Sequence, residues 1–413
     1  MSLATNFSGN DFSILPPEPG LTAQEVLARA EAISPNLVGR QGETEERTFY
    51  ALDTHEAFRK AGFYRLLVPR RFGGYEFGID TFLRVVIALT RGCPSTGWMY
   101  CLGAAHALAV GTLFDERAQE EIFAGGDFIC PATIVPNGTA ERRGDEGWVL
   151  NGTWGYCSGS PYATYFMGHT LVTREEGGEP SPMLFILPRS QWRRLDDWGR
   201  QMGLKGTGSH SIKVEDGFVP DHLTIGRHMS EVDVSLGTPG RELHGNPLYG
   251  GGQLSFMIME DAALMIGMAK GALDAYEDLM RNRTTLFPPI VDRVQDPDFQ
   301  YRYGEAAGMI AAGEAALMQA VQQWTAFATE GPQAVTRERE LRIAAICHEV
   351  FKLGWGAVER YLFPTAGSSA VRRGERMERV WRDMSMFHTH AGVSIYLATN
   401  AKRELAKARF GID

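Results

Sequence analysis

The chain has 413 residues, of which 44% are hydrophobic and 22% are charged, and its formal net charge is −9. A chain of this length is expected to form two or three domains with a sizeable core. No apolar run approaches the roughly 18 residues of a membrane span, and no Lys/Arg cluster interleaved with aromatics indicates a nucleic acid as partner.

The first third of the chain is predicted to be helical. Residues 1–20 are rich in Pro and Gly and are expected to form a loose arm. Apolar positions then recur at helical spacing through the segments LTAQEVLARAEAI, THEAFRKAGFYRLL and DTFLRVVIALTR. Cys93-Pro-Ser-Thr-Gly-Trp98 opens a mostly apolar helix, which we expect to be buried on nearly all sides. We place an N-terminal helical domain at residues 21–128.

His106 lies inside that apolar helix, where a charged imidazolium would be costly. We therefore expect a neutral ring. Two interpretations stay open: a core histidine bonded to a backbone carbonyl, and a substrate contact at a domain junction.

Residues 129–238 are predicted to form a β domain, a barrel or a sandwich. Val, Ile, Thr, Phe and Trp occur there in short runs between turn residues, through FICPATIV, WVLNGTWGY, TYFMGHTLVT, MLFILP and SIKVEDGFVP. Gly203-Leu-Lys-Gly-Thr-Gly208 looks like a dinucleotide loop, but no suitable strand precedes it and a strand-like segment follows. A Rossmann nicotinamide site is therefore not expected.

Within this region, Trp148 to Gly168 alternates small, aromatic and hydroxyl side chains. Asn151-Gly152 predicts a hairpin turn. In Ser158-Gly159-Ser160 the glycine would let the main chain approach a flat ring, and the hydroxyls can donate to a ring nitrogen or to an oxygen bound to it. That arrangement would suit a flavin; the alternative is an edge hairpin whose aromatic residues only pack.

Residues 239–413 return to the helical period in four long segments, which is typical of an antiparallel four-helix bundle. Their many small residues permit close helix packing within the chain or with a second subunit, so an oligomer is expected.

The cysteines and the N-terminus bear on the compartment. The five cysteines, at positions 93, 101, 130, 157 and 347, show no CxxC spacing, so neither a metal site nor a disulfide framework is expected. The N-terminus lacks a basic start followed by an apolar stretch, the pattern of a secretory signal. We expect a cytoplasmic protein.

Four stretches in sequence order carry a resemblance: Cys93–Trp98 with His106, Gly152–Gly159, Gly203–Ser209 leading to Val219-Pro220, and Trp381-Arg-Asp383 with His388 and His390. Together they resemble the oxygenase branch of the acyl-CoA dehydrogenase superfamily, the reduced-flavin-dependent monooxygenases of two-component systems. The resemblance runs from about residue 21 to the C-terminus. It implies an α+β fold with an N-terminal helical domain, a middle β-barrel or sandwich domain and a C-terminal four-helix bundle.

The catalytic base of the dehydrogenases is missing. They place a glutamate eight residues beyond an Arg-Asp pair, and Ala391 stands at that position here. A second subgroup carries it on the first bundle helix, where Met257 stands, with Glu260 as the nearest carboxylate. Without a carboxylate that removes the α-proton, acyl-CoA desaturation has no mechanism.

The resemblance implies that a separate NAD(P)H-flavin reductase delivers reduced FMN or FAD. This flavin would react with O2 to give a C4a-hydroperoxide that hydroxylates a small aromatic, phenolic substrate, while the protein keeps the adduct dry. Oxygenation of sulfur or nitrogen is the main rival. Two alternatives come from other classes: an acyl-CoA dehydrogenase-like enzyme using Glu260, and a non-catalytic scaffold.

The resemblance also assigns catalytic and substrate-binding roles. Ser158 is expected near N5 and C4a of the flavin, and His390 at the same edge, managing protons. His388 lies two residues away and cannot share that face of a helix. His106 would bind the phenolate, and Trp98 would wall the pocket.

For the flavin itself, the resemblance implies a lining by Ala132, Thr133 and the segment from Trp154 through Tyr156 to Ser158. Arg281 or Arg283 would hold the flavin phosphate. Gly367, Ser368 and Ser369 match a turn that approaches the flavin from the partner chain of a homotetramer. Arg382-Asp383 is expected to be a structural pair.

Overall fold

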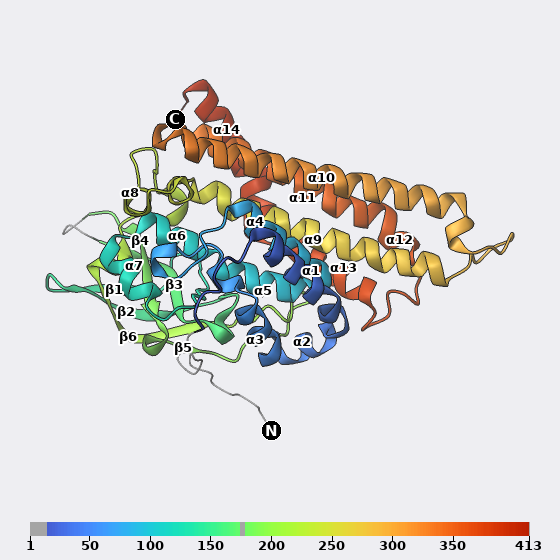
Figure 1. Ribbon diagram of the computed structural model, residues 1–413, viewed down its shortest axis with the longest axis horizontal. Helices are drawn as coiled ribbons and strands as arrows, with labels where there is room; N and C mark the ends of the chain where they lie inside the picture. Colours follow the sequence, from blue (N-terminus) through green and yellow to red (C-terminus); the bar gives the residue numbers. More distant parts are fainter. Residues whose placement is uncertain (1–14, 174–177, 413) are drawn as a thin grey trace.

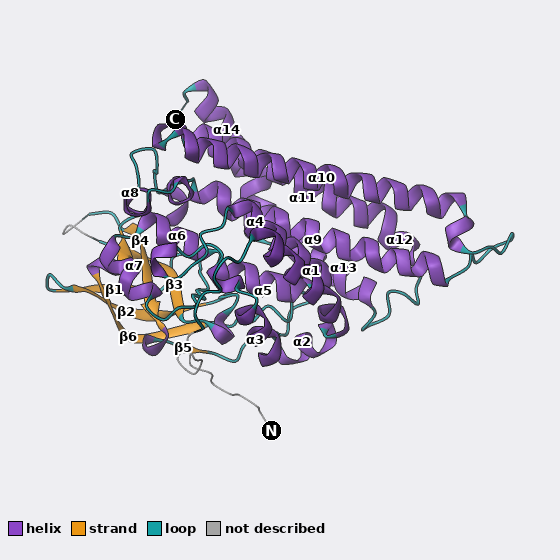
Figure 2. Cartoon of the chain, viewed as in Figure 1, coloured by secondary structure: helices purple, strands orange, loops and turns teal. Residues whose placement is uncertain are grey.

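The computed structural model describes residues 15–173 and 178–412, so most of the expected arm at residues 1–20 lies outside the described residues. The strands gather at one end of the molecule, and the long helices run along one side and extend past the other end (Figures 1 and 2). The N-terminal helices lie between these two parts (Figure 1). The predicted α+β fold class, with a helical part, a β part and a second helical part in that order, is confirmed.

The N-terminal part contains seven α-helices among the described residues. They are α1 (Ala23–Gly39), α2 (Gln41–Arg47), α3 (Leu52–Lys60), α4 (Ile79–Gly92), α5 (Pro94–Ala104), α6 (His106–Leu113) and α7 (Glu116–Phe123). The first begins at a capping box, in which the side chains of Thr22 and Glu25 each bond the backbone N–H of the other.

Two of the predicted helices are shorter than their periodicity indicates. The segment from Thr54 leaves the helix after Lys60, because Gly62 takes φ +81° and the chain continues as a 3₁₀ turn. The apolar segment after Trp98 is split at Ala105 into α5 and α6.

Two antiparallel sheets form the β part. One has the strand order β1-β2-β6-β5, from Thr139–Arg143, Gly147–Trp154, Ile212–Pro220 and Arg193–Arg194. The other has the order β3-β4-β7, from Tyr165–Val172, Ser181–Pro188 and Thr224–Ile225. Alternating large apolar side chains such as Leu150, Phe166 and Phe185 are buried between them.

Two predictions for this part were wrong. The segment FICPATIV does not form a regular strand: it makes one isolated parallel bridge to β3, between Ala132 and Met167, with backbone hydrogen bonds on either side of it. Asn151-Gly152 is not a turn but lies inside β2, where the register to β6 shifts. The Asn151 side chain bonds Asp216 across this bulge, which accounts for the polar pair in mid-strand.

The C-terminal part is built on the long helices α9 (Gln253–Asn282), α10 (Pro297–Glu330) and α11 (Arg337–Ala357), preceded by the short α8 (Pro239–His244). Helix α9 packs against α4, α10, α11 and α13 (Arg376–His388), so it is the central element of this part. After α11 the chain continues through a π-helical turn, Val358–Leu362, into α12 (Phe363–Ala366).

The fourth predicted bundle helix is broken. Helix α13 ends at His388, and the chain resumes as a π-helix, Gly392–Asn400, followed by α14 (Ala401–Phe410). His390 lies in the break between them. Among the described residues no helix is long and apolar enough to cross a membrane.

Candidate functional site

Trp98 joins the three parts of the molecule. It lies on α5, and its indole Nε1 donates a hydrogen bond of 3.0 Å to Ser158 Oγ in the loop after β2. The same ring meets Phe387 edge-on, with 4.8 Å between centroids, and lies 5.7 Å from the ring of His390. Three predicted site residues, Trp98, Ser158 and His390, are therefore neighbours although they come from distant segments of the chain.

Ser158 is the first member of a chain of hydroxyl groups. Its Oγ lies 2.7 Å from Ser209 Oγ, which in turn lies 2.6 Å from Thr207 Oγ1. The Thr207 hydroxyl donates to the carbonyl of Leu204 at 2.9 Å. All three hydroxyl residues are buried. The network explains why Ser209 and Thr207, which lie in a loop before β6, belong to the site.

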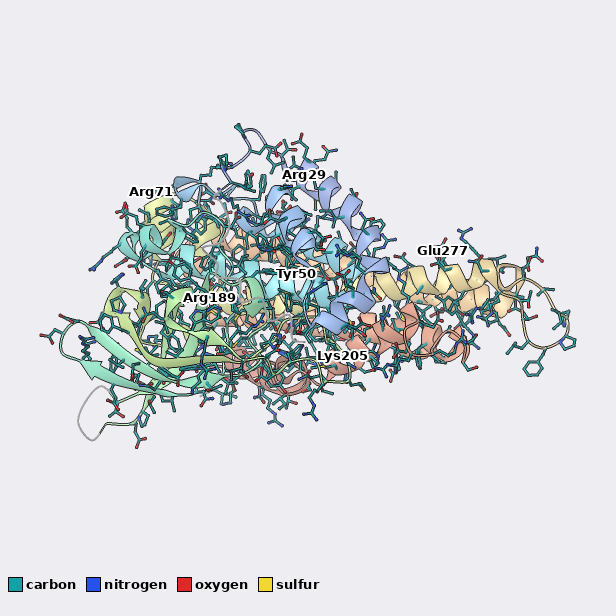
Figure 3. All side chains as sticks on the ribbon, turned by 90° about the horizontal axis from the view of Figure 1, so that it is seen from below. Arg29, Tyr50, Arg71, Arg189, Lys205 and Glu277 are labelled. Atoms are coloured by element: carbon teal, nitrogen blue, oxygen red, sulfur yellow. The ribbon has the colours of Figure 1, made fainter. Side chains whose placement is uncertain are left out.

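The loop Gly203–Gly208 is an anchor rather than a dinucleotide loop. The N–H of Leu204 donates to Asp383 Oδ1 at 2.5 Å, and that of Gly206 donates to Ser95 Oγ at 3.2 Å. A side chain at Gly203 would collide with the backbone of α13, since its Cβ would come within 2.2 Å of the Arg382 carbonyl. Figure 3 shows Lys205 of this loop where it meets the C-terminal helices.

Arg382 and Asp383 are both structural, but they do not pair with each other as predicted. Arg382 binds Glu45 at 2.9 Å and Glu378, while Asp383 accepts the hydrogen bond from Leu204. Burial raises the pKa of Asp383 to about 7, an effect that the Leu204 N–H opposes.

Gly159 is required for packing against α5. Its φ is +93°, and an added Cβ would lie 3.3 Å from the carbonyl of Met99 and 3.4 Å from Cα of Gly103. The close approach that the sequence led us to expect is therefore made to a helix of the same chain. It fixes Ser158 next to Trp98.

His388, the last residue of α13, and His390, in the break after it, contact different aromatic residues. His388 lies against Trp355, with 4.7 Å between ring centroids, whereas His390 lies against Trp98. A Cβ on Gly392 would come within 3.1 Å of His390 Nδ1 and 3.6 Å of Asp261 Oδ2. The imidazole of His390 and the carboxylate of Asp261 thus both lie next to the position that a side chain at 392 would take.

Asp261 is a functional candidate that the sequence reasoning missed. It follows Glu260 on α9, and the fold brings it near Gly392 and His390 from a distant segment of the chain. Desolvation raises its pKa to about 6, and the charge of His390 acts in the opposite direction. A carboxylate beside an imidazole that reaches Trp98 would influence the orientation and charge of that imidazole.

Glu260 cannot serve as the base of a dehydrogenase here. It is buried, with 2% of its surface exposed, and its carboxylate is approached by the thiol of Cys101 at 3.8 Å. Burial raises its pKa well above the usual range, because desolvation disfavours the charged form. An enclosed carboxyl held against the Cys101 thiol lacks the access to a substrate that proton abstraction requires.

His106 has the contact that a core histidine would have. Its Nδ1 donates to the carbonyl of Cys130 at 2.8 Å, and 8% of the residue is exposed. Burial lowers its pKa, against the opposing effect of the Cys130 and Leu102 carbonyls. The ring is therefore neutral, with its proton on Nδ1 and a lone pair on Nε2.

Two further histidines donate hydrogen bonds to backbone carbonyls in the loop that contains Cys130. His169 Nδ1 donates to Thr133 O at 2.8 Å, and His228 Nε2 donates to Ile134 O at 2.7 Å. Their rings stack with centroids 4.3 Å apart. Neither histidine was singled out from the sequence, because each lies outside any motif and only the fold brings both to one loop.

The residues predicted to line the flavin differ in their exposure. Ala132 and Thr133 are half-buried. Trp154 is 1% exposed, donates to the His169 carbonyl and packs against Phe185, so its side chain belongs to the core between the sheets. Tyr156 is 70% exposed, with φ +60°, and lies on the surface beside Trp198.

The predicted phosphate-binding residues lie elsewhere in the chain. Arg283 donates to Ser369 Oγ at 2.7 Å, which joins it to the Gly367-Ser368-Ser369 turn. Arg281 pairs with Glu277, which Figure 3 places on the part of α9 that protrudes from the body. Figure 1 shows that end of α9 at the opposite end of the molecule from the β sheets. Arg283 directly follows this end of α9.

The residues at the junction fit the isoalloxazine of a flavin. Thr133 Oγ1 is buried and has no hydrogen-bond partner among the described residues, which is unusual for a polar atom. The edge of a flavin ring carries both N–H and C=O groups, either of which would satisfy this hydroxyl. Ser158 and Trp98 add a hydroxyl and an aromatic wall, the mixture of polar and apolar groups that cofactor sites use.

A separate open groove of about 690 Å³ lies between α4 and α10. It is lined by residues including Asp80, Arg84, Gln322 and Thr325. None of the predicted site residues lines it. We therefore assign the site by the contacts at the junction rather than by this groove.

Comparison with known proteins gives the family. Residues 260–395 match the family described as acyl-CoA dehydrogenase, C-terminal domain. The chain is 30% identical over 370 residues to the flavin-dependent monooxygenase oxygenase subunit HsaA of Rhodococcus jostii, covering 88% of this chain and 94% of that protein. It is 27% identical over 398 residues to the oxygenase component of an FADH2-dependent resorcinol hydroxylase of a Rhizobium species, covering 93% of this chain and 95% of that protein.

The crystal structure of a 3-HSA hydroxylase from a Rhodococcus species superimposes with a TM-score of 0.84 at 28% identity, covering 94% of this chain and 97% of the other. The fold and the sequence therefore define an acyl-CoA dehydrogenase-like flavoprotein of the oxygenase branch. The chain belongs to the reduced-flavin-dependent monooxygenases, the oxygenase components of two-component systems, and its cofactor is reduced FMN or FAD. The predicted family is confirmed.

Proposed function

We propose that this oxygenase hydroxylates a small phenolic substrate at the junction of Trp98, Ser158, His390 and His106. The proposal is carried by one observation: Trp98 bonds Ser158 and also lies against His390, so α5, the β part and the broken helix supply one site. The name of the resorcinol hydroxylase, a relative over nearly its whole length, supports a phenolic substrate.

Each residue has a role that its contacts support. The reduced flavin, when bound, supplies activated dioxygen for the transfer of one oxygen atom. Ser158 and Thr133 would bond the ring of the flavin, and Trp98 would exclude water from one side of it. His106 would accept a hydrogen bond from the substrate hydroxyl at Nε2, because its only proton is committed to Cys130.

His390 would take up and release protons at the open side of the site. Its side chain is exposed in the single chain, so it can exchange protons with solvent, while its ring also reaches Trp98. The Asp261 carboxylate beside Gly392 would favour one orientation of this imidazole. The pair acts as a proton-handling group next to the substrate, not as a base for acyl-CoA.

The remaining predictions concern assembly and location. We propose that Arg283, with the turn of Ser369, holds the flavin phosphate of a neighbouring copy in a homotetramer, because it follows the end of α9 that lies away from the β sheets. A separate NAD(P)H-flavin reductase would supply the reduced flavin. The five cysteines are free and buried, which agrees with a cytoplasmic enzyme.

The proposal is tested with purified protein and chemically defined flavin. Photoreduced FMN or FAD is mixed anaerobically with the protein and then with oxygenated buffer, and the return of oxidised-flavin absorbance is followed with and without resorcinol. We expect reoxidation to be slower than in buffer, and we expect a hydroxylated product to replace hydrogen peroxide when the phenol is present.

Three outcomes would count against the proposal. Flavin that reoxidises as fast as in buffer would remove the protected site. Oxygenation of a thioether or amine probe, with phenols inert, would assign the site to heteroatom chemistry. Anaerobic reduction of an electron acceptor by an acyl-CoA would restore the dehydrogenase alternative that the buried Glu260 argues against.

A further inference from the structure

Only one assignment of donors and acceptors satisfies every hydrogen bond of the hydroxyl chain at Ser158. The carbonyl of Leu204 can only accept, so the proton of Thr207 Oγ1 is committed to it over 2.9 Å. Thr207 must then accept from Ser209, and Ser209 must accept from Ser158. The indole N–H of Trp98 can only donate, and it occupies one lone pair of Ser158 Oγ.

The direction of the chain decides what Ser158 can offer to a bound molecule. Its proton points to Ser209 and one lone pair is taken by Trp98, which leaves a single lone pair. Ser158 is therefore an acceptor toward the site, although serine in isolation can act as either donor or acceptor. This property comes from Thr207 and Ser209, neither of which needs to touch the bound molecule.

We propose that Thr207 and Ser209 are positioning residues that make the site select reduced over oxidised flavin. The inference rests on the proposed function, in which Ser158 bonds the flavin ring, and on the expectation that the bonded edge is the one that carries N5. Reduced flavin carries a hydrogen on N5 and can donate to Ser158, whereas oxidised flavin has only a lone pair there. Two lone pairs facing each other form no hydrogen bond.

Oxidised flavin could bond Ser158 without leaving the lone pairs of Ser158 and Ser209 opposed only if the whole chain reversed. Ser158 would have to donate to N5, Ser209 to Ser158, and Thr207 to Ser209, so the carbonyl of Leu204 would lose its hydroxyl donor. That carbonyl keeps the indole N–H of Trp198 at 3.1 Å, so reversal is possible but costs one buried hydrogen bond. The chain thus favours an enzyme that captures reduced flavin and releases it after oxidation.

The test compares two dissociation constants in each variant. FMN and FAD are titrated aerobically in their oxidised forms and anaerobically after photoreduction, and the ratio of oxidised to reduced dissociation constants is taken. Because both constants come from the same protein, a general loss of folding or of site shape largely cancels in the ratio. No turnover is needed.

Three single variants distinguish the effect of the relay, which is the hydroxyl chain of Ser158, Ser209 and Thr207, from the effect of neighbouring groups. Thr207→Val removes the acceptor for Ser209, which frees Ser209 to donate to Ser158. Thr207→Ser keeps the hydroxyl and should keep the ratio. Ser160→Ala is the matched control, because its hydroxyl lies in the same loop but donates to Gly208 O outside the relay at 2.8 Å.

We expect the ratio to fall about tenfold in Thr207→Val, roughly the effect of one hydrogen bond, and to stay within about twofold of wild type in Thr207→Ser and Ser160→Ala. Ser209→Ala, which removes the acceptor of the Ser158 proton, should act in the same direction and replaces Thr207→Val if that variant does not fold. An unchanged ratio in both relay variants overturns the inference while leaving the proposed function standing. Wild-type protein that binds neither flavin overturns both.

Discussion

His169 and His228 stack with their ring centroids 4.3 Å apart, and each holds one of two consecutive carbonyls, those of Thr133 and Ile134. His169 also accepts the N–H of Met229 at Nε2, so its ring is a neutral Nδ1–H tautomer that links two backbone groups. Burial lowers its pKa to about 4, which keeps it neutral near pH 7. The loop that carries the unpaired Thr133 hydroxyl is thus positioned by imidazole donors.

The two contacts of His169 can be separated by substitution. An asparagine places its amide N–H near the position of Nδ1, whereas a glutamine reaches the position of Nε2. His169→Asn should keep the Thr133 contact and lose the Met229 contact, and His169→Gln should do the reverse. We expect each to lower the free energy of unfolding by about 1–3 kcal/mol, because each leaves one buried polar group unpaired.

Only the glutamine variant should also weaken the binding of reduced flavin, by about tenfold, since only it releases the Thr133 carbonyl. Urea unfolding and anaerobic flavin titration measure the two effects. His222→Ala is the control, because that histidine pairs with Glu121 away from the loop. Equal flavin affinity in both His169 variants would show that the hydrogen bond from His169 to the Thr133 carbonyl stabilises the fold but does not affect flavin binding.

The two histidines of the broken helix give a second prediction. His390→Ala should raise the share of reduced flavin that yields hydrogen peroxide instead of product, while flavin binding stays mostly intact, because the imidazole that handles protons beside Trp98 is removed. His388→Ala should leave the ratio of peroxide to product near that of wild type, since its ring faces Trp355. Peroxide and product are quantified per flavin oxidised. Unchanged coupling in His390→Ala would remove His390 from the site.

A third prediction concerns Asp383, whose pKa is raised to about 7 by burial. The folded protein binds this proton more tightly than the unfolded chain, so the stabilising contribution is complete below about pH 4 and is lost as the pH rises through 7. The full loss would be about 4 kcal/mol in the free energy of unfolding. Asp383→Asn keeps an acceptor for Leu204 but does not titrate.

The difference in unfolding free energy between Asp383→Asn and wild type should therefore be small at pH 4 and favour the variant at pH 8. Taking the difference cancels the pH dependence of unfolding free energy that comes from the carboxylates common to both proteins. Asp145→Asn, at an exposed turn between β1 and β2, is the control, and its difference from wild type in unfolding free energy should be the same at both pH values. A difference that is the same at both pH values would contradict a proton held by Asp383 in the folded state.

Much of this architecture follows from local patterns. The order of helical, β and helical parts and the long helices α9 and α10 follow from periodicity, because each buries a continuous stripe or face. The break before Gly392 does not follow from it: Thr389 and His390 leave the helix, although the periodicity predicts one continuous helical segment there. A turn signal such as Asn151-Gly152 failed for a related reason, since the bulge is stabilised by Asp216 on a distant strand.

The site shows the same division. Trp98, Ser158 and His390 could be proposed because they sit in motifs of the resembled family, and the structure brings them together. Asp261, His169, His228 and the relay residues Ser209 and Thr207 act through contacts between segments far apart in the chain. Trp154 had the residue type expected of a ring wall, but its burial between the sheets depends on Phe166 and Phe185. Composition and spacing carry no information on such partners.

The last prediction tests whether a site is shared between copies of the chain. Arg283 bonds Ser369 at the end of α9, whereas Arg281 is tied to Glu277 on the exposed helix surface. If Arg283 holds the flavin phosphate, Arg283→Ala should weaken flavin binding about tenfold through the loss of a charge-assisted contact, and Arg281→Ala should change it little. Flavin titration of the two variants makes this comparison.

Co-expression of Arg283→Ala with Ser158→Ala then distinguishes a shared site from one within a chain. If Arg283 serves the flavin bound at Ser158 of a neighbour, random pairing restores about a quarter of the sites, because some combine the intact Ser158 of one chain with the intact Arg283 of another. Such mixed oligomers should bind reduced flavin at about that fraction with wild-type affinity. If Arg283 serves its own chain, every site carries one lesion and no wild-type fraction returns, which would contradict the proposed assembly.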